Sequence, residues 1–195
     1  IIMSSQVELH EFVKKTLYKL AGITLSDNKD IMISNRLEKL KRNTNYRGNI
    51  EDLLQEISEG SYTTEFINTF TTNKTHFFRE EFHFADLKNR VLPQFANNSI
   101  KMYCSAASTG EEPYSMAMTI KEFNPMMKAQ IIATDIDTNV LQHAANGVYR
   151  YSKSSKEFPD WIKPQKYFKK RVNKSLIGDE VFIKANDELK NMITL

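Results

Sequence analysis

The sequence predicts a mixed α/β fold, in which a small all-α N-terminal domain precedes the first part of a parallel sheet covered by helices. Two observations carry this prediction. Up to about residue 90, apolar residues recur at helical spacing, with no strand-like alternation of any length. From about residue 99 onward, two short apolar runs are separated by a helical stretch, which is the order of a parallel crossover.

Four helices are expected in the N-terminal third, each with apolar residues three or four positions apart. Their apolar positions fall within residues 9–20, 33–40, 50–57 and 66–70. Gly22 and Gly60 follow the first and third helices and end them. Ser26 or Asp27 is expected to cap the second helix, whose other face is basic.

The sheet is expected to begin with IKMYCSA at residues 100–106, followed by the loop STGEE and a helix of about ten residues. A second strand is expected in AQIIATDID at residues 129–137. Farther along, residues 167–172 and 180–184 flank NKSLIG, which predicts a β-hairpin.

The composition is that of an ordinary globular protein, with 41% apolar and 26% charged residues in a chain of 195. The net charge of +3 is too small to indicate nucleic-acid binding. Cys104 is the only cysteine, which excludes an internal disulfide framework and favours a reducing, cytoplasmic location. No apolar run approaches the roughly 18 residues of a membrane span, so no membrane insertion is expected.

The segment CSAASTGEEPYS, residues 104–115, carries the strongest chemical signal. It places a loop and a helix N-terminus at the carboxyl edge of a parallel sheet, where α/β proteins bind ligands. Gly110 stands alone, so the segment is not a dinucleotide fingerprint, and Glu111 and Glu112 favour a cationic or amine-bearing ligand. The alternative is that both acids merely stabilise the helix N-terminus.

Asp135 ends the second predicted strand, where a carboxylate can accept both hydroxyls of a ribose. Together with the first loop, this position points to an adenosine ligand without a pyrophosphate. The alternative is that Asp135 or Asp137 caps the helix that begins near Thr138.

The third signal is TTNKTHFFREEFHF, residues 71–84. Its four phenylalanines are interpreted as core between the two domains. Asn73, Thr75 and Arg79 are polar and suggest a binding role, since the Arg79 guanidinium offers a fork of donors that matches a carboxylate.

Four strings, TTNKTHFFRE, SAASTGEEPYSMAM, ATDIDTNVL and A-x-x-GVYR, together resemble the chemotaxis receptor methyltransferase family of the CheR type. This family transfers methyl groups from S-adenosylmethionine to receptor glutamates. The strings occur in order and at matching spacing across nearly the whole chain, so the resemblance is highly specific.

The resemblance implies a helical N-terminal domain at residues 5–90 and a Rossmann-like methyltransferase domain, incomplete here, at residues 91–195. An inserted small antiparallel β-subdomain would cover residues 149–186. The implied cofactor is S-adenosylmethionine, with S-adenosylhomocysteine as product. The positions that match the family's cofactor contacts, with Arg79 also expected to be catalytic, are Asn73, Thr75, Arg79, Gly110, Glu111, Glu112 and Asp135.

No metal is expected, because a sulfonium methyl group is already activated and its transfer mainly needs two reactants in register. The histidines also lack metal-ligand spacing. The implied partner is the cytoplasmic part of a methyl-accepting receptor, whose acidic helices would meet Lys29, Arg36 and Arg42. The alternative for the basic clusters is a solvated surface. Some members also bind a receptor's C-terminal peptide on the β-subdomain as an added strand.

Family members continue well beyond Leu195, with further strands that complete the sheet and the adenine side of the site. On this basis the chain is expected to be a fragment whose first strand has an unpaired edge. The alternative function is therefore a catalytically inactive fragment that binds receptor or cofactor.

Overall fold

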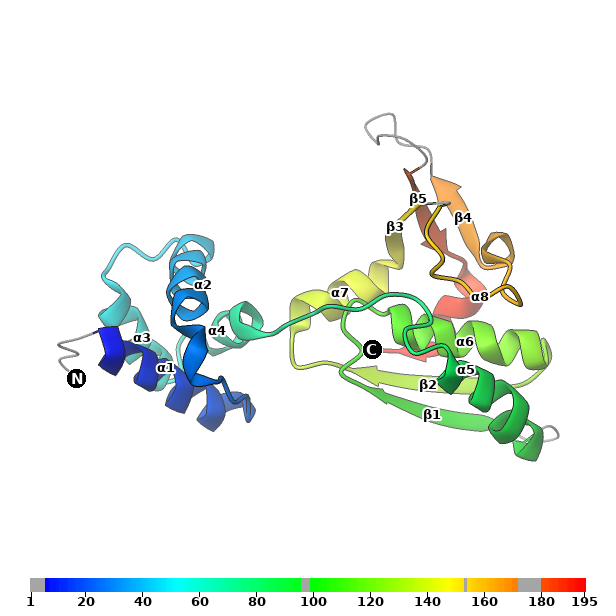
Figure 1. Cartoon of the computed structure of the whole chain (residues 1–195), viewed down its shortest axis with the longest axis horizontal. Coiled ribbons are helices and arrows are strands. Elements are labelled where there is room, and N and C mark those ends of the chain that lie inside the picture. Colours follow the sequence, from blue (N-terminus) through cyan, green and yellow to red (C-terminus); the bar gives the residue numbers. More distant parts are fainter. Residues whose placement is uncertain (1–5, 96–98, 153, 172–179) are drawn as a thin grey trace. The chain divides into compact units, whose positions relative to one another are not determined.

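The computed structural model describes residues 6–95, 99–152, 154–171 and 180–195. The chain forms two compact units (Figure 1). One extends to Thr72 and includes Ile136–Thr138, and the other contains Asn73–Asp135 and Asn139–Leu195. Residues 73–90, which the sequence pattern groups with the helical domain, therefore have most of their contacts in the second unit.

The first unit is a helical bundle. Its helices are α1 (Gln6–Ala21), α2 (Asp30–Asn43), α3 (Ile50–Ser58) and α4 (Thr63–Phe70). The apolar stripes of these helices face one another and form a single core. Its fully buried members are Val13, Leu17, Ile33, Leu37, Leu40, Leu53, Leu54, Ile57 and Phe66. The four helices expected from the sequence are confirmed.

The predicted cap of the second helix is wrong. Ser26 precedes a separate 3₁₀ turn, Asp27–Lys29, and its hydroxyl donates to the side chain of Asn28. The Asp27 carboxylate accepts from the Lys14 ammonium at 3.0 Å. Both polar groups are thus engaged outside α2, which begins at Asp30.

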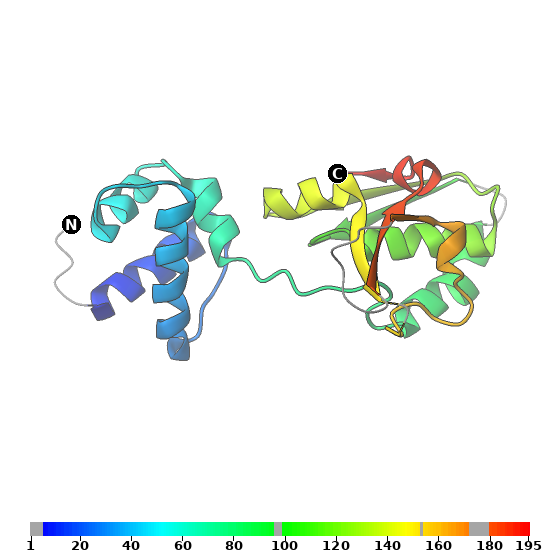
Figure 2. The same ribbon diagram turned by 90° about the horizontal axis from the view of Figure 1, so that it is seen from above.

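The second unit contains a parallel sheet of three strands in the order β1, β2, β6. These are β1 (Ile100–Ser105), β2 (Ala129–Thr134) and β6 (Ile193–Thr194). Helix α6 (Glu111–Phe123) connects β1 to β2 and lies along one face of the sheet (Figures 1 and 2). The predicted mixed α/β class with a parallel crossover is confirmed. The carboxyl ends of β1 and β2 lie side by side, since Ser105 pairs with Thr134.

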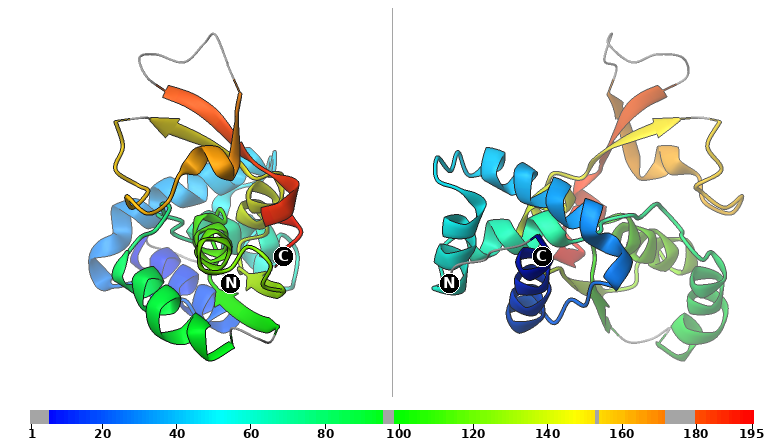
Figure 3. Two further views of the ribbon diagram at one scale, coloured as in Figure 1. Left: turned by 90° about the vertical axis from the view of Figure 1, so that its right-hand side faces the viewer. Right: turned by 60° about the vertical axis from the view of Figure 1, so that its left-hand side comes forward.

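A separate antiparallel sheet has the order β3, β5, β4 (Figure 3). Its strands are β3 (Val148–Ser152), β4 (Phe168–Arg171) and β5 (Glu180–Ala185). The predicted pairing of the two hairpin strands is confirmed by β4 and β5, while NKSLIG lies outside the described residues. The sequence did not predict β3, which follows helix α7 (Thr138–Asn146) directly at Gly147.

Residues 73–84 of the aromatic segment belong to the second unit, where three of the four phenylalanines join the core. Phe77, Phe78 and Phe84 are buried there, whereas Phe82 is 62% exposed. Phe77 stacks on Phe158 at a centroid distance of 5.0 Å. The interpretation of these rings as core between two domains is therefore wrong, because their partners are aromatic residues of the same unit.

The segment continues into helix α5 (Phe82–Asp86), a π-helical turn at Leu87–Val91 and a 3₁₀ turn at Leu92–Phe95. Helix α8 (Asp187–Lys190) leads from β5 to β6, and Asn186 caps it by accepting from the Leu189 N–H at 2.9 Å. Among the helices that the structure describes, none has the length and apolar character required to cross a bilayer.

Candidate functional site

The loop after β1 has an unusual backbone. Ala106, Ser108 and Gly110 all adopt positive φ angles, of 55°, 50° and 98°. This alternation coils the chain tightly between β1 and the first turn of α6. The Ala107 N–H donates to the Thr134 carbonyl at 2.9 Å, so the loop is anchored to the end of β2.

Ser108 connects two of the predicted site residues. Its backbone N–H donates to the Asp135 carboxylate at 2.8 Å, and its hydroxyl donates to the Asn73 carbonyl at 3.3 Å. Ser108 itself is only 8% exposed, whereas Asp135 is half-buried and Asn73 is exposed. The sequence analysis singled out the loop that contains Ser108 but not Ser108 itself, because the contribution of this residue depends on the direction of its backbone N–H.

Glu111 and Glu112 have different surroundings. The Glu111 carboxylate accepts from the Thr109 hydroxyl at 2.5 Å, which closes the loop on itself. Glu112 is exposed and accepts from the Cys104 thiol at 3.5 Å. Both acids lie in the first turn of α6, where a negative charge is favourable, and of the two only Glu112 lines the hollow that follows.

A hollow of about 460 Å³ lies beside α6, with Arg79 and Glu112 in its wall. Its other lining residues are Glu80, His83, Phe84, Leu87, Met102 and Met116. The lining thus combines one arginine, one histidine, two carboxylates and four apolar side chains. Such a hollow can hold a zwitterion with an apolar chain, because each charged group can meet its opposite.

The segment that carries Asn73, Thr75 and Arg79 is held against α6. The Phe78 N–H donates to the buried Ser115 hydroxyl at 3.0 Å, and one Arg79 nitrogen donates to the Lys74 carbonyl at 3.2 Å. Thr75 is half-buried, while Asn73 and Arg79 are exposed. The structure brings Asn73 and Asp135 together through Ser108, and Arg79 and Glu112 together at the hollow.

The other predicted acid, Asp137, accepts from the Thr71 hydroxyl at 2.7 Å within the first unit. Asp135 instead faces the loop after β1. Of the two carboxylates that follow β2, Asp137 is thus bonded within the helical unit and Asp135 is bonded to the loop after β1.

Cys104 points away from solvent and is 2% exposed. Burial, with a smaller contribution from Glu112, raises the pKa of the Cys104 thiol to about 12. The thiol therefore stays protonated at neutral pH and packs as a small apolar side chain.

We expect Cys104 to react with a maleimide at least about tenfold more slowly in the folded protein than in the denatured chain, near pH 8. The thiolate is the reactive form, and both burial and the raised pKa suppress it. Timed quenching followed by intact-mass measurement reports this site alone, because Cys104 is the only cysteine. Equal rates in the folded and denatured protein would contradict the assignment.

The predicted receptor-binding residues differ in accessibility. Lys29 and Arg42 are exposed, whereas Arg36 is half-buried. The Arg36 guanidinium donates to the Thr71 carbonyl at 3.0 Å and lies 6.0 Å from the Phe70 ring centroid. Burial lowers the pKa of Arg36. Arg36 therefore contributes to the packing of α2 against the end of α4, whatever else it binds.

Arg42 lines a shallow hollow of about 520 Å³ at the end of α2. Its remaining lining residues are Glu38, Lys41, Asn45, Tyr46 and Arg47. Three of the six side chains are cationic, so the hollow favours an anionic group.

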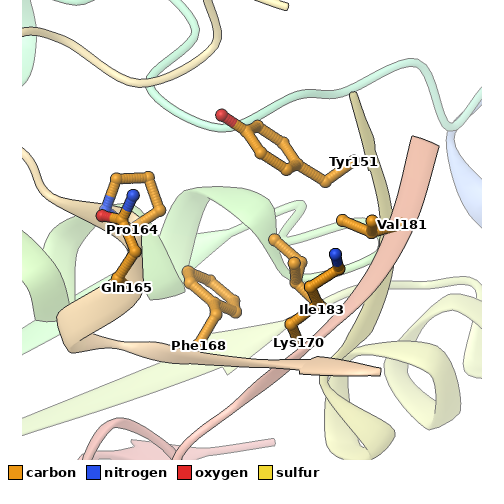
Figure 4. Close-up of a pocket in the computed structure, with 7 residues that line it drawn as sticks. All are labelled: Tyr151, Pro164, Gln165, Phe168, Lys170, Val181 and Ile183. Carbon is orange, nitrogen blue, oxygen red and sulfur yellow. The ribbon is translucent and has the colours of Figure 1, made fainter. Parts of the chain in front are cut away.

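The antiparallel sheet carries a further hollow, of about 380 Å³ (Figure 4). Its walls come from all three strands and the preceding 3₁₀ turn: Tyr151, Pro164, Gln165, Phe168, Lys170, Val181 and Ile183. The lining is mainly apolar, and none of the residues predicted for cofactor binding belongs to it.

Comparison with known proteins agrees with this geometry. The family model described as "CheR methyltransferase, SAM binding domain" matches residues 73–195. The "Chemotaxis protein methyltransferase" of Escherichia coli (strain K12) is 33% identical over 185 residues, which cover 93% of this chain and 62% of that protein. "Chemotaxis protein methyltransferase 2" of Pseudomonas aeruginosa is 40% identical over 144 residues, or 70% of this chain and 50% of that protein.

The chain thus spans between half and about three fifths of the length of these relatives. The matched region starts at Asn73 and includes the loop at Gly110 and the strand end at Asp135. Because the family model matches residues 73–195 and the Escherichia coli relative is 33% identical over 93% of this chain, we conclude that the chain belongs to the CheR methyltransferase family.

Proposed function

We propose that this chain binds S-adenosylmethionine at the carboxyl ends of β1 and β2 and takes part in methylating glutamate side chains of chemotaxis receptors. The observation that carries the proposal is the bonding of Ser108 to both Asp135 and the Asn73 segment. This arrangement lies inside the region matched by a family model for S-adenosylmethionine binding.

The side chains fit the parts of this cofactor. A carboxylate has lone pairs for about four hydrogen bonds, so Asp135 can accept the Ser108 N–H and ribose hydroxyls together. The exposed Glu112 carboxylate suits the cofactor's amino group, and the Arg79 guanidinium suits its carboxylate. Glu111, already bonded to Thr109, shapes the loop at Gly110. Asn73 and Thr75 complete the polar side of the proposed site.

The chemistry requires little acid–base assistance. The bound sulfonium would supply an activated methyl group, and S-adenosylhomocysteine would be the product. A glutamate acceptor has an ordinary pKa of about 4.3, so it is ionised at neutral pH without a general base. The residues of this chain would therefore act by holding the cofactor and the receptor glutamate in line. Arg79, which would bind the cofactor's carboxylate, is the residue that we propose to be catalytic.

The direct test is isothermal titration calorimetry with S-adenosylhomocysteine, followed by transfer of labelled methyl groups to a purified receptor cytoplasmic domain. Saturable binding together with labelled glutamate would support the full proposal. Absence of heat with S-adenosylhomocysteine, together with no competition from S-adenosylmethionine, would contradict it.

A second candidate is binding without turnover, as a receptor-binding or cofactor-binding module. The observation that favours it is the largely cationic hollow at the end of α2, lined by Lys41, Arg42 and Arg47, which can bind an anionic surface without any part in methyl transfer. Binding of S-adenosylhomocysteine without methyl transfer would separate this candidate from the first. Either function is proposed to operate in the cytoplasm, on the receptor part exposed there.

Charge reversal tests the proposed receptor surface. We expect the double variant Lys29→Glu/Arg42→Glu to lower receptor methylation about fivefold at low salt, because both exposed cations would face acidic receptor helices. The difference should shrink as salt rises, and affinity for S-adenosylhomocysteine should not change. Initial methylation rates at several salt concentrations provide the measurement.

The matched control for this pair is Lys15→Glu/Lys19→Glu, which reverses two exposed charges on α1. Equal losses in both double variants would indicate a general charge effect and contradict the assignment of receptor binding to Lys29 and Arg42. Arg36 is unsuitable for this test, because its reversal would also break the bond to the Thr71 carbonyl.

A further inference from the structure

Tyr149 is a buried tyrosine of β3 that contacts the segments forming the proposed cofactor site. It is 4% exposed, and it pairs with Ile183 in the antiparallel sheet. Its place in the sequence, within A-x-x-GVYR, gives no chemical reason for a hydroxyl group, since a phenylalanine would fill the same apolar space. The contacts of the hydroxyl supply that reason.

The Tyr149 hydroxyl donates to the Thr109 carbonyl at 2.8 Å. Thr109 lies between Ser108 and Gly110, in the loop with the positive φ angles. A Cβ atom on Gly110 would come within 2.9 Å of the same hydroxyl, so the phenol also packs directly on the loop backbone. Burial raises the pKa of Tyr149 well above its usual range, which keeps the hydroxyl protonated as a donor.

The ring of Tyr149 reaches the other segment of the site. It packs edge-on against Phe77 at a centroid distance of 4.9 Å, and Phe77 lies between Thr75 and Arg79 in the sequence. The Tyr149 side chain therefore contacts both the loop that contains Ser108 and the segment to which the Ser108 hydroxyl donates. Its hydroxyl holds one segment by a directional bond, and its ring holds the other by packing.

We propose that Tyr149 is a positioning residue for the cofactor site, whose bond to the Thr109 carbonyl holds the Ser108 N–H in line with Asp135. The inference rests on the proposed binding of S-adenosylmethionine and adds a residue outside the predicted set. Loss of the hydroxyl removes this partner from the carbonyl of the half-buried Thr109 and lets the loop relax. The Ser108–Asp135 bond then no longer prearranges the ribose end of the site.

The test is Tyr149→Phe in the full chain, which keeps the ring and removes the hydroxyl. We expect the dissociation constant for S-adenosylhomocysteine, measured by calorimetry, to rise about tenfold, the loss expected for one buried hydrogen bond. Hydrogen exchange at the amides of residues 106–110 should become faster. The amides of the helical unit should exchange as in the parent protein.

Tyr114→Phe is a matched control. Tyr114 is 2% exposed, and its hydroxyl donates to the Ala144 carbonyl at 3.1 Å, so this variant also loses one buried phenol-to-carbonyl bond. Both variants should lower Tm to a similar extent. Only Tyr149→Phe should weaken S-adenosylhomocysteine binding, whereas Tyr114→Phe should stay within about twofold of the parent protein.

Equal affinities in the two variants would overturn the positioning role. If the parent protein itself fails to bind S-adenosylhomocysteine, the proposed function fails. Hydrogen exchange then tests separately whether Tyr149 stabilises the loop at residues 106–110. Faster exchange at residues 106–110 in Tyr149→Phe, with no change in Tyr114→Phe, would support the conclusion that the Tyr149 hydroxyl stabilises the loop conformation. Unchanged exchange in both variants would overturn it.

Discussion

Replacing Gly110 by alanine is expected to lower the free energy of unfolding of the sheet-containing unit by about 3 to 5 kcal/mol. Two costs combine. Gly110 has φ of 98°, a conformation that residues with a Cβ atom adopt only under strain. The added Cβ would also lie 2.7 Å from the Cβ of Ala144 and 3.1 Å from its Cα, so a helix would have to move.

Gly60→Ala separates these two costs. Gly60 has a similar φ of 107°, but a Cβ there would meet nothing within 4 Å. This control should therefore cost only about 1 to 2 kcal/mol, in the helical unit. Urea unfolding followed by circular dichroism gives both values. Equal losses in the two variants would show that the close approach of α7 to the loop contributes nothing.

The sequence predicted the parts of the fold in which local pattern and packing agree. The stripes of α1 to α4 face the core of the helical unit, and the two apolar runs form β1 and β2 in parallel register. Strand β3 was missed, because GVYR is too short to show alternation and follows a helix without a loop. The cap of α2 was missed because tertiary contact decides it: Lys14, from another helix, binds Asp27.

The candidate site, too, contains residues that the sequence could identify and residues that it could not. Two acidic residues, Glu112 in the first turn of α6 and Asp135 directly after β2, could be singled out because a carboxylate at the carboxyl edge of a parallel sheet suggests a ligand contact. Ser108 could not, since its contribution is a backbone N–H whose direction depends on loop conformation. Tyr149 could not either, because its partner lies 40 residues away in the sequence. Sequence alone therefore identified the groups that would touch a ligand more readily than those that hold them in place.

Asp135→Ala is expected to raise the dissociation constant for S-adenosylhomocysteine about 30- to 150-fold, or about 2 to 3 kcal/mol. The variant removes a charged acceptor proposed for the ribose hydroxyls. It also takes away the partner of the Ser108 N–H, which lies in a residue only 8% exposed. A donor left without a partner in such surroundings adds its own penalty, so the loss should exceed that of a single ligand bond.

Asp135→Asn separates the loss of the negative charge from the loss of the acceptor for the Ser108 N–H. The amide keeps one carbonyl oxygen for the Ser108 N–H but has no negative charge and fewer acceptor sites, so we expect a smaller loss, about tenfold. Asp86→Ala removes an exposed acid of the same unit, paired with Arg90, and should leave the affinity unchanged. If Asp135→Ala binds S-adenosylhomocysteine as the parent protein does, Asp135 does not belong to the site. If the alanine and asparagine variants lose affinity equally, the bond from Ser108 does not contribute to binding, and only the carboxylate charge does.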